Sequence, residues 1–304
     1  MTERHDNGED GLAEGPEGDQ PMSFFDHLAE LRKRLVRAAL AIGTCFVLAY
    51  AFVDHLTQIV LRPYKLAWDS VQARCIESSG EACLPETGAT LINLTAFESV
   101  LTDIRIAVIA SIFIGAPVIF YQLWMFISPG LYTREKKLVV PFAATSALMF
   151  VGGAVFCYFL ALPIATDFLL DYPLKKDIGH GVKIIANYTY VDYVKYATRL
   201  LLGFGLMFEF PLAVYFLARA GMITHKSLLR HWKVIILSFF IVGAILTPPE
   251  PVTQVLMALP MTVLFAISIG VAYMVSKPQL EELARLEAEL AAEAAREDDE
   301  EADD

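Results

Sequence analysis

The chain has 304 residues, of which 56% are hydrophobic, and its formal net charge is −11. This composition is too apolar for an ordinary soluble domain, and apolar runs of about 18 residues or more indicate transmembrane helices. The acidic charge lies in two tails, residues 1–20 and 277–304, which together carry −15 and leave +4 for the body between them. The sequence therefore argues against a nucleic-acid-binding protein, which needs a basic face.

The charge distribution predicts three parts. Residues 1–22 form an acidic tail that is expected to be disordered, because it has too few apolar residues to fold. Residues 23–276 form a membrane domain. Residues 277–304 form a second acidic tail, which begins with strong helix formers and is expected to be partly helical and then disordered.

Six apolar segments predict six transmembrane helices. In chain order they cover residues 36–53, 104–127, 139–168, 193–217, 234–246 and 252–275. The first is too long for a signal peptide and lacks a cleavage site behind it, so we expect it to be retained. The fifth is short, because about 13 helical residues rise only about 20 Å and a hydrocarbon core is about 30 Å thick. Pro163 predicts a kink or an early end in the third segment.

Two amphipathic segments lie beside the first two spans. The sequence "FFDHLAELRKRL", residues 24–35, predicts a helix that lies at the membrane surface and then turns into the first span. The sequence "LTAFESVLTDIRIA", residues 94–107, predicts a cap along the membrane surface before the second span. Residues 55–103 as a whole are expected to form the longest loop.

Lysine and arginine predict the orientation. Twelve of these bases lie in or beside the loops at one end of the spans and six at the other end, which favours cytoplasmic N- and C-termini. The loop at residues 55–103 then faces the outside. Cys75 and Cys83 lie in it and can form a disulfide in an oxidising compartment. Cys45 and Cys157 lie inside apolar spans and are interpreted as small buried residues.

Glu209 is the acidic residue that a membrane span least tolerates. An ionised carboxylate at bilayer depth costs about 2.5–3.5 kcal/mol on insertion scales. Two interpretations stay open: a protonated or paired structural glutamate, or a functional group in a polar cavity. Pro211 frees a backbone carbonyl close by. Gln254 follows the stiff turn at residues 247–251, and either faces inward or caps the last span.

Motifs for catalysis are missing from the sequence. We find no nucleophile elbow, no phosphate-binding loop and no zinc-protease motif, so the sequence predicts no enzymatic activity, no cofactor and no metal site. Glu135 lies among bases and, taken alone, would be a surface ion pair worth about 0–1 kcal/mol.

Four stretches, in this order along the chain, resemble the TatC family, the polytopic core subunit of the bacterial twin-arginine protein translocase. They read "HLAELRKRL", "APVIFYQLWMFISPGLYTREKKLVVP", "FGLMFEFPLAVYFLARAGMIT" and "ILTPPEPVTQVLMALPM". The resemblance implies an all-α integral membrane protein with six transmembrane helices in a cupped, glove-like bundle. It also implies a location in the bacterial cytoplasmic (inner) membrane and no enzymatic activity.

The resemblance further implies binding of Arg-Arg signal peptides on folded precursors, whose export the proton-motive force drives. The implied partners are single-span subunits of the TatA and TatB types and further copies of the chain itself. Carried over by position, the signal-binding acids are Glu30 and Glu135, with Phe126 beside them and Arg32 among the bases that orient them. The implied intramembrane polar site comprises Glu209 and Gln254, with the backbone opened by Pro211.

Two other functions remain as alternatives. The first is a proton-coupled small-solute transporter that uses Glu209, and the second is a purely structural scaffold. The transporter is the weaker case, because Glu209 is a lone intramembrane acid and the sequence shows none of the internal repeats on which many transporter folds are built.

Overall fold

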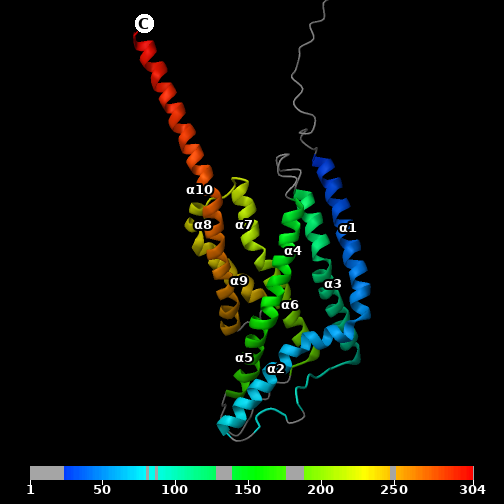
Figure 1. Cartoon of the computed structure of the whole chain (residues 1–304). Coiled ribbons are helices and arrows are strands. Elements are labelled where there is room, and N and C mark those ends of the chain that lie inside the picture. Colours follow the sequence, from blue (N-terminus) through cyan, green and yellow to red (C-terminus); the bar gives the residue numbers. More distant parts are fainter. Residues whose placement is uncertain are drawn as a thin grey trace, which may run out of the picture.

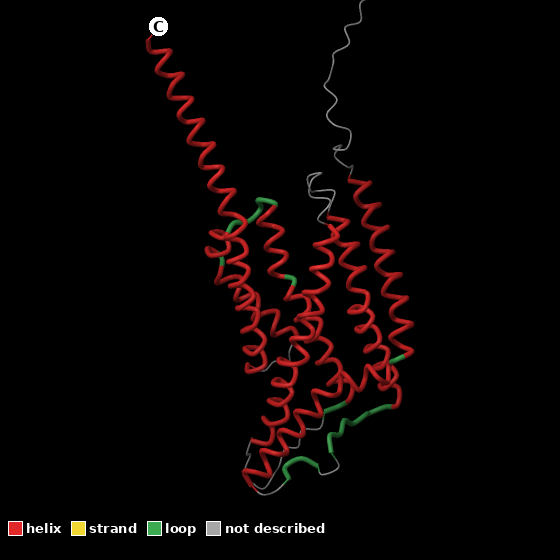
Figure 2. The backbone as a smooth tube through the Cα atoms, in the orientation of Figure 1, coloured by secondary structure: helices red, strands yellow, loops and turns green. Residues whose placement is uncertain are grey.

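The structure is a computed structural model that describes residues 24–79, 82–85, 88–127, 139–175, 188–246 and 251–303. The N-terminal tail, Glu135 and the double-proline turn lie outside this part of the chain. The described residues are almost all helical (Figures 1 and 2). In chain order the elements are α1 (Phe24–Ala51), α2 (Val53–Ser79), α3 (Ala96–Ile127), α4 (Val139–Phe156), the π-helical η3 (Cys157–Ala161), α5 (Leu162–Lys175), α6 (Tyr190–Phe208), α7 (Phe210–Arg219), α8 (His225–Arg230), α9 (Trp232–Leu246) and α10 (Pro251–Asp303).

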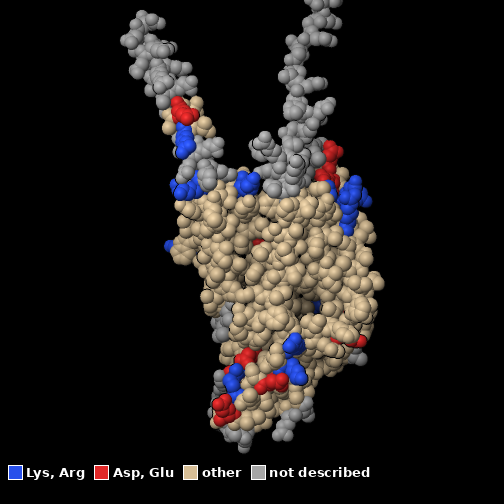
Figure 3. Space-filling view, viewed as in Figure 1, with Lys and Arg blue, Asp and Glu red and all other residues tan. Residues whose placement is uncertain are grey.

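The apolar helices confirm the predicted spans. Five segments are long and apolar enough to cross a membrane: Phe25–Ala51, Phe97–Ile127, Val139–Leu174, Tyr190–Arg219 and Met257–Lys277. The sixth, Trp232–Ile245, is shorter, and it is the one whose short length the sequence predicts. In the view of Figure 3, charged side chains gather at the two ends of the bundle, and the broad band between them shows only isolated charged atoms. That band is the surface that a lipid bilayer covers.

The helices pack into two groups joined through α6. In the first group α1 packs on α3, α3 on α4 and α4 on α6; in the second, α10 packs on α7 and α9. The helix α2 runs obliquely beneath the bundle and packs on α5 (Figure 1). The start of α1 and the end of α10 lie at the same end of the molecule, where α10 projects well beyond the other helices. This arrangement is the expected six-span fold.

Three local expectations differ from the structure. The helix α1 runs straight from Phe24 into the span, without a turn at the membrane surface. Residues 96–107 form the first turns of α3 rather than a separate cap. The surface helix is instead α2, in the region expected to be a loop. Its buried residues Tyr64, Ala67, Trp68 and Val71 follow helical spacing, which is the signal that identifies it.

Two breaks interrupt the longer spans. The π-helical turn η3 ends two residues before Pro163, and the backbone N–H of Leu162 donates to the Cys157 carbonyl across the wider turn. Pro163 has no backbone N–H, so the regular helical pattern is interrupted here. The second break separates α6 from α7 at Glu209, and Pro211 lies in the first turn of α7. The chain continues in helical geometry through this break, because the backbone N–H of Ala213 donates to the carbonyl of Glu209 at 2.9 Å.

Polar contacts fasten α2 to the end of the bundle opposite the start of α1. The Ser70 hydroxyl and the Arg74 guanidinium both donate to Asp167 on the Val139–Leu174 span, the second at 2.7 Å. The Gln72 side chain exchanges two hydrogen bonds with the backbone of Leu84, of which the shorter is 3.0 Å. A disulfide joins Cys75 to Cys83, whose Cα atoms lie 5.8 Å apart. These contacts make α2 and the segment after it a fixed part of the fold.

Removing this disulfide is expected to loosen the segment around Leu84. Closing a loop of this length stabilises the folded state by about 2–3 kcal/mol in the chain-entropy model. Cys75→Ser or Cys83→Ser should therefore speed limited proteolysis between residues 79 and 95, measured by mass spectrometry of the purified chain. Cys45→Ser, at a free cysteine of α1, is the control and should leave the rate unchanged. Equal cleavage rates in all three variants would contradict the expectation.

Candidate functional site

A partly buried ion pair lies at the start of α1. The Glu30 Oε1 atom accepts hydrogen bonds from Nη2 of Arg34 at 2.9 Å and from its Nε at 3.3 Å. The Glu30 side chain is only 19% exposed and the Arg34 side chain only 17%. The Arg34 Nη1 atom also donates to Oε1 of Gln122 on α3 at 3.4 Å. Arg34 therefore fixes the glutamate against the end of α3, while Oε2 of Glu30 has no hydrogen-bond donor among the described residues.

An aromatic pair adjoins this ion pair on the same two helices. The His27 ring stacks on Phe126, with ring centroids 4.4 Å apart and an interplanar angle of 22°. His27 lies three residues before Glu30 on α1, and Phe126 lies four residues after Gln122 on α3. The close packing of α1 on α3 thus brings a carboxylate and an aromatic surface to one end of the bundle.

The structure brings two of the sequence-predicted residues of this site to the same end of the bundle. Glu30 and Phe126 come together at the α1–α3 end, as the resemblance implies. Arg32 is exposed and forms no ion pair within the described residues; Arg34 is the base that orients Glu30. Glu135 lies outside the described residues. The spacing of four residues between Glu30 and Arg34 is a sequence signal for this pair.

A second polar site surrounds Glu209 at the junction of α6 and α7. Its Oε1 atom is buried and accepts no hydrogen bond of normal geometry within the described residues. The Ser146 hydroxyl and the backbone of Phe150, both on α4, are polar groups that face this carboxyl group. Ser146 in turn accepts a hydrogen bond of 2.8 Å from Nε1 of Trp124 on α3. The chain from Trp124 through Ser146 leads to Glu209 across three helices.

Two glycines allow α4 and α6 to approach closely beside Glu209. A Cβ atom on Gly153 would lie 2.6 Å from the Phe204 carbonyl oxygen and 2.8 Å from the Phe208 ring. A Cβ atom on Gly205 would lie 2.8 Å from the Phe150 ring. Small residues at a helix crossing are a common device of membrane proteins, because they bring backbones into contact. These contacts set the position of Glu209 relative to α4.

Gln254 belongs to a different contact. Its Nε2 atom donates to the Phe240 carbonyl of α9 at 2.8 Å, and Gly243 of α9 packs on the same side chain. Gln254 therefore faces inward, which was one of the two predicted alternatives. It ties α10 to α9, whereas Glu209 faces α4.

A groove of about 500 Å³ opens beside Pro211 between α4, α7 and α10. Its lining residues are mostly apolar: Pro141, Phe142, Thr145, Met149, Pro211, Leu212, Tyr215, Arg219 and Val271. An apolar groove of this kind, within the spans, suits the side of another helix better than a polar solute.

The fold and these sites define a multispan helical membrane protein with an oriented carboxylate at one end and a buried carboxyl group within the bundle. The family model described as "Sec-independent protein translocase protein (TatC)" matches residues 26–260. The chain therefore belongs to the TatC family and is a subunit of the twin-arginine protein translocase.

Relatives support this membership over most of the chain. The Sec-independent protein translocase protein TatC of Helicobacter pylori strain J99 is 38% identical over 82% of this chain and 88% of its own length. The protein of the same name from Halothiobacillus neapolitanus is 32% identical over 99% of this chain and 76% of its own length. The predicted family is thus confirmed, and the small-solute transporter receives no support.

A solved structure supports the same conclusion for the fold. A crystal structure described as that of the twin arginine translocase receptor TatC is 34% identical to this chain and superimposes with a TM-score of 0.64. The match covers 81% of this chain and 97% of that chain. A second crystal structure of that receptor, in the detergent DDM, gives a TM-score of 0.65.

Proposed function

We propose that this chain is the receptor subunit that binds the Arg-Arg signal peptides of folded export precursors, with Glu30 and Glu135 as the two receiving carboxylates. The observation that carries the proposal is the state of Glu30: one oxygen is held by Arg34 and the other has no donor within the described residues. A guanidinium pairs strongly with a carboxylate that is already oriented, because little side-chain entropy remains to be lost.

Two adjacent arginines need two acids, and Glu135 is the second acid of the proposal. Phe126 supplies the remaining surface, because a guanidinium plane stacks favourably on an aromatic face. The His27 ring covers Phe126 in the structure. A signal peptide would displace that ring or stack beside it. Arg32, being exposed, adds positive charge near the site without holding either acid.

Glu209 and Pro211 form the proposed intramembrane partner site, and Gln254, which is hydrogen-bonded to α9, lies in a separate contact that holds α10 in place. The apolar groove beside Pro211 supports it, because the groove has room for the side of a single transmembrane helix. The TatA- and TatB-type subunits, each with one span, are the proposed occupants, and self-association of the chain is proposed as well. Glu209, whose Oε1 atom is buried against α4 next to this groove, gives the site its acidic group.

The location follows from the fold and the charges. The described ends of α1 and α10 lie at the same end of the bundle, and the basic residues are more numerous at that end. We therefore infer that both termini face the cytoplasm of a bacterium, from its inner membrane, and that export uses the proton-motive force. No enzymatic step is part of this proposal.

Photocrosslinking tests the receptor site. A photoreactive phenylalanine in place of Phe126 should crosslink to a precursor that carries an Arg-Arg signal and not to the same precursor with Lys-Lys. The matched control is the same group in place of Phe159, an exposed residue within the third span. Equal crosslinking from both positions, or to both precursors, would overturn the assignment.

A further inference from the structure

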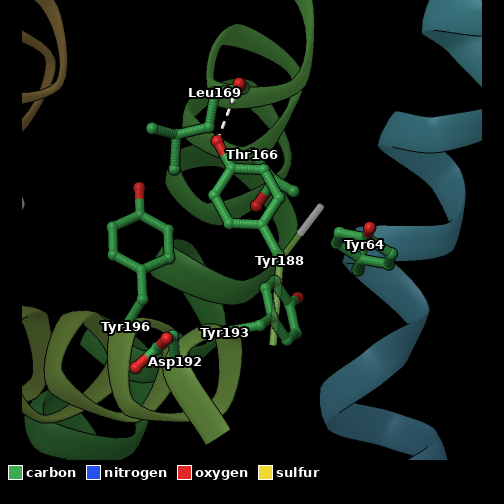
Figure 4. Close-up of a pocket in the computed structure, with 7 residues that line it drawn as sticks. All are labelled: Tyr64, Thr166, Leu169, Tyr188, Asp192, Tyr193 and Tyr196. Carbon is green, nitrogen blue, oxygen red and sulfur yellow. Dashed lines mark hydrogen bonds between the residues drawn. The ribbon is translucent and has the colours of Figure 1, made fainter. Parts of the chain in front are cut away.

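A cavity of about 170 Å³ lies at the outer end of the bundle, and none of its lining residues belongs to the sites above. Figure 4 shows four tyrosine rings standing around it, from α2, from α6 and from the segment before α6. Its lining residues are Tyr64, Thr166, Leu169, Tyr188, Asp192, Tyr193 and Tyr196. A cavity of about 150 Å³ in a protein interior can hold a benzene molecule, so this one has room for a small organic group.

Hydrogen bonds to the backbone fix three of the four rings. The hydroxyl of Tyr64 donates to the Thr90 carbonyl, that of Tyr188 to the Leu169 carbonyl, and that of Tyr193 to the Val60 carbonyl. The Tyr64 and Tyr193 rings lie 5.0 Å apart with an interplanar angle of 60°. Because these hydroxyls bind the backbone, the aromatic rings themselves are what the side chains offer to an occupant.

A carboxylate lies at the cavity, and its second oxygen accepts a hydrogen bond of 2.6 Å from the Thr189 hydroxyl. Asp192 is the acid among its lining residues, and its side chain is 63% exposed. The neighbouring cation is Lys195, whose Nζ stays 3.8 Å from Asp192, at the limit of an ion pair. Burial, with a smaller contribution from Tyr188, raises the pKa of Tyr64 to about 12, so this ring remains a neutral phenol at physiological pH.

We propose that this tyrosine cage binds an organic ammonium group, primary or quaternary, from the outer face of the membrane. Aromatic faces attract cations through their quadrupole, and cages of aromatic rings recognise quaternary ammonium groups. Asp192 lies beside the rings and adds a carboxylate to the lining. The cavity also lies at the right depth. Its lining residues come from the end of the span that finishes at Leu174 and from the start of the span that begins at Tyr190, the level of phospholipid headgroups.

Binding of choline to the full chain in detergent tests the ligand class. The comparison ligand is the neutral isostere of choline, in which a tert-butyl group replaces the trimethylammonium group. Saturation-transfer NMR should show that choline binds and that the isostere binds at least about fivefold more weakly. Equal binding of the two would mean an apolar cavity without preference for charge, and binding of neither would also overturn the proposal.

Variants of the cage locate the binding. Tyr196→Phe keeps the ring and should retain choline affinity within about twofold, whereas Tyr196→Leu and Asp192→Asn should each weaken it about fivefold. Tyr172→Leu, at an exposed tyrosine of α5 outside the lining, is the matched control. Thermal unfolding shows that each variant is folded. If Tyr196→Leu and Tyr172→Leu have equal effects, the cage is not the site.

The ammonium group can come from a lipid headgroup or from a free amine, and native mass spectrometry separates the two sources. Chain extracted from bilayers of equal phosphatidylethanolamine and phosphatidylglycerol should retain the ethanolamine lipid, and Tyr196→Leu should abolish that preference. If choline binds but neither lipid is preferred, the source is a free amine. This test does not depend on signal-peptide binding, so it can fail while the proposed receptor function holds.

Discussion

Glu30→Lys is expected to reduce the affinity of a twin-arginine signal peptide at least about 100-fold. The substitution removes a charge-assisted hydrogen bond, worth about 1.5–3 kcal/mol, and sets an ammonium group against the incoming guanidinium. It also removes the carboxylate that neutralises Arg34, which keeps only its hydrogen bond to Gln122, so a further positive charge is left at the site. The measurement is fluorescence anisotropy of a labelled signal peptide with the detergent-solubilised chain at fixed salt.

A neighbouring carboxylate provides the control for charge alone. Asp26 lies one turn before Glu30 on α1 and is exposed, so Asp26→Lys changes the net charge equally while the Glu30 carboxylate itself is kept. Asp26→Lys should lower the affinity for the signal peptide by less than about threefold. The affinity of Arg34→Gln should lie between those of Glu30→Lys and Asp26→Lys, because Glu30 keeps its charge but loses its orientation. Affinity for Glu30→Lys equal to that of Asp26→Lys would show that Glu30 does not receive the signal.

Gly153→Leu is expected to prevent assembly of the bundle. Even a Cβ atom at this position meets a backbone oxygen at 2.6 Å, and backbone cannot move aside as a flexible side chain can. Overpacking of well-packed contacts costs about 1–3 kcal/mol for small additions, and a leucine adds much more than a methyl group. We therefore expect little monodisperse protein on size-exclusion chromatography, and a lowered unfolding temperature for the milder Gly153→Ala.

The adjacent glycine is the matched control for this substitution. Gly152 lies on the same helix, and a Cβ atom there has no neighbour within 4 Å. Gly152→Leu and Gly152→Ala should therefore leave yield and unfolding temperature close to those of the parent chain. If the two positions respond alike, the close crossing of α4 and α6 does not stabilise the fold.

The spans were predictable because each is a long apolar run, and even the short length of α9 is visible in the sequence. The surface helix α2 was missed because it has no long apolar run: its buried face is a narrow stripe that includes Tyr64 and Trp68, and polar residues interrupt its other apolar positions. A search for helical spacing within the expected loop would have found it. The apolar content of a segment identifies helices that cross the membrane, but it does not identify an amphipathic helix such as α2.

The candidate site was predictable to different degrees. Glu30, Phe126 and Glu209 followed from the resemblance and from the cost of a buried acid. Arg34 could have been identified from its spacing on α1, because Arg32 points to another side of the helix. Gln122 could not, because its contact with Arg34 joins residues 88 positions apart and depends on the packing of α1 on α3.

The projecting end of α10 has an electrostatic consequence for the acidic C-terminus. The helix continues for 26 residues after Lys277, so it carries its last residues about 40 Å away from the end of the span. The Debye length at physiological ionic strength is about 8 Å, so charges at that distance are screened from the lipid headgroups and from the basic end of the bundle. Residues 293–303, with a net charge of −6, lie at least about 24 Å beyond Lys277, so their charge acts mainly on molecules in the surrounding solution, and the spans themselves scarcely experience it.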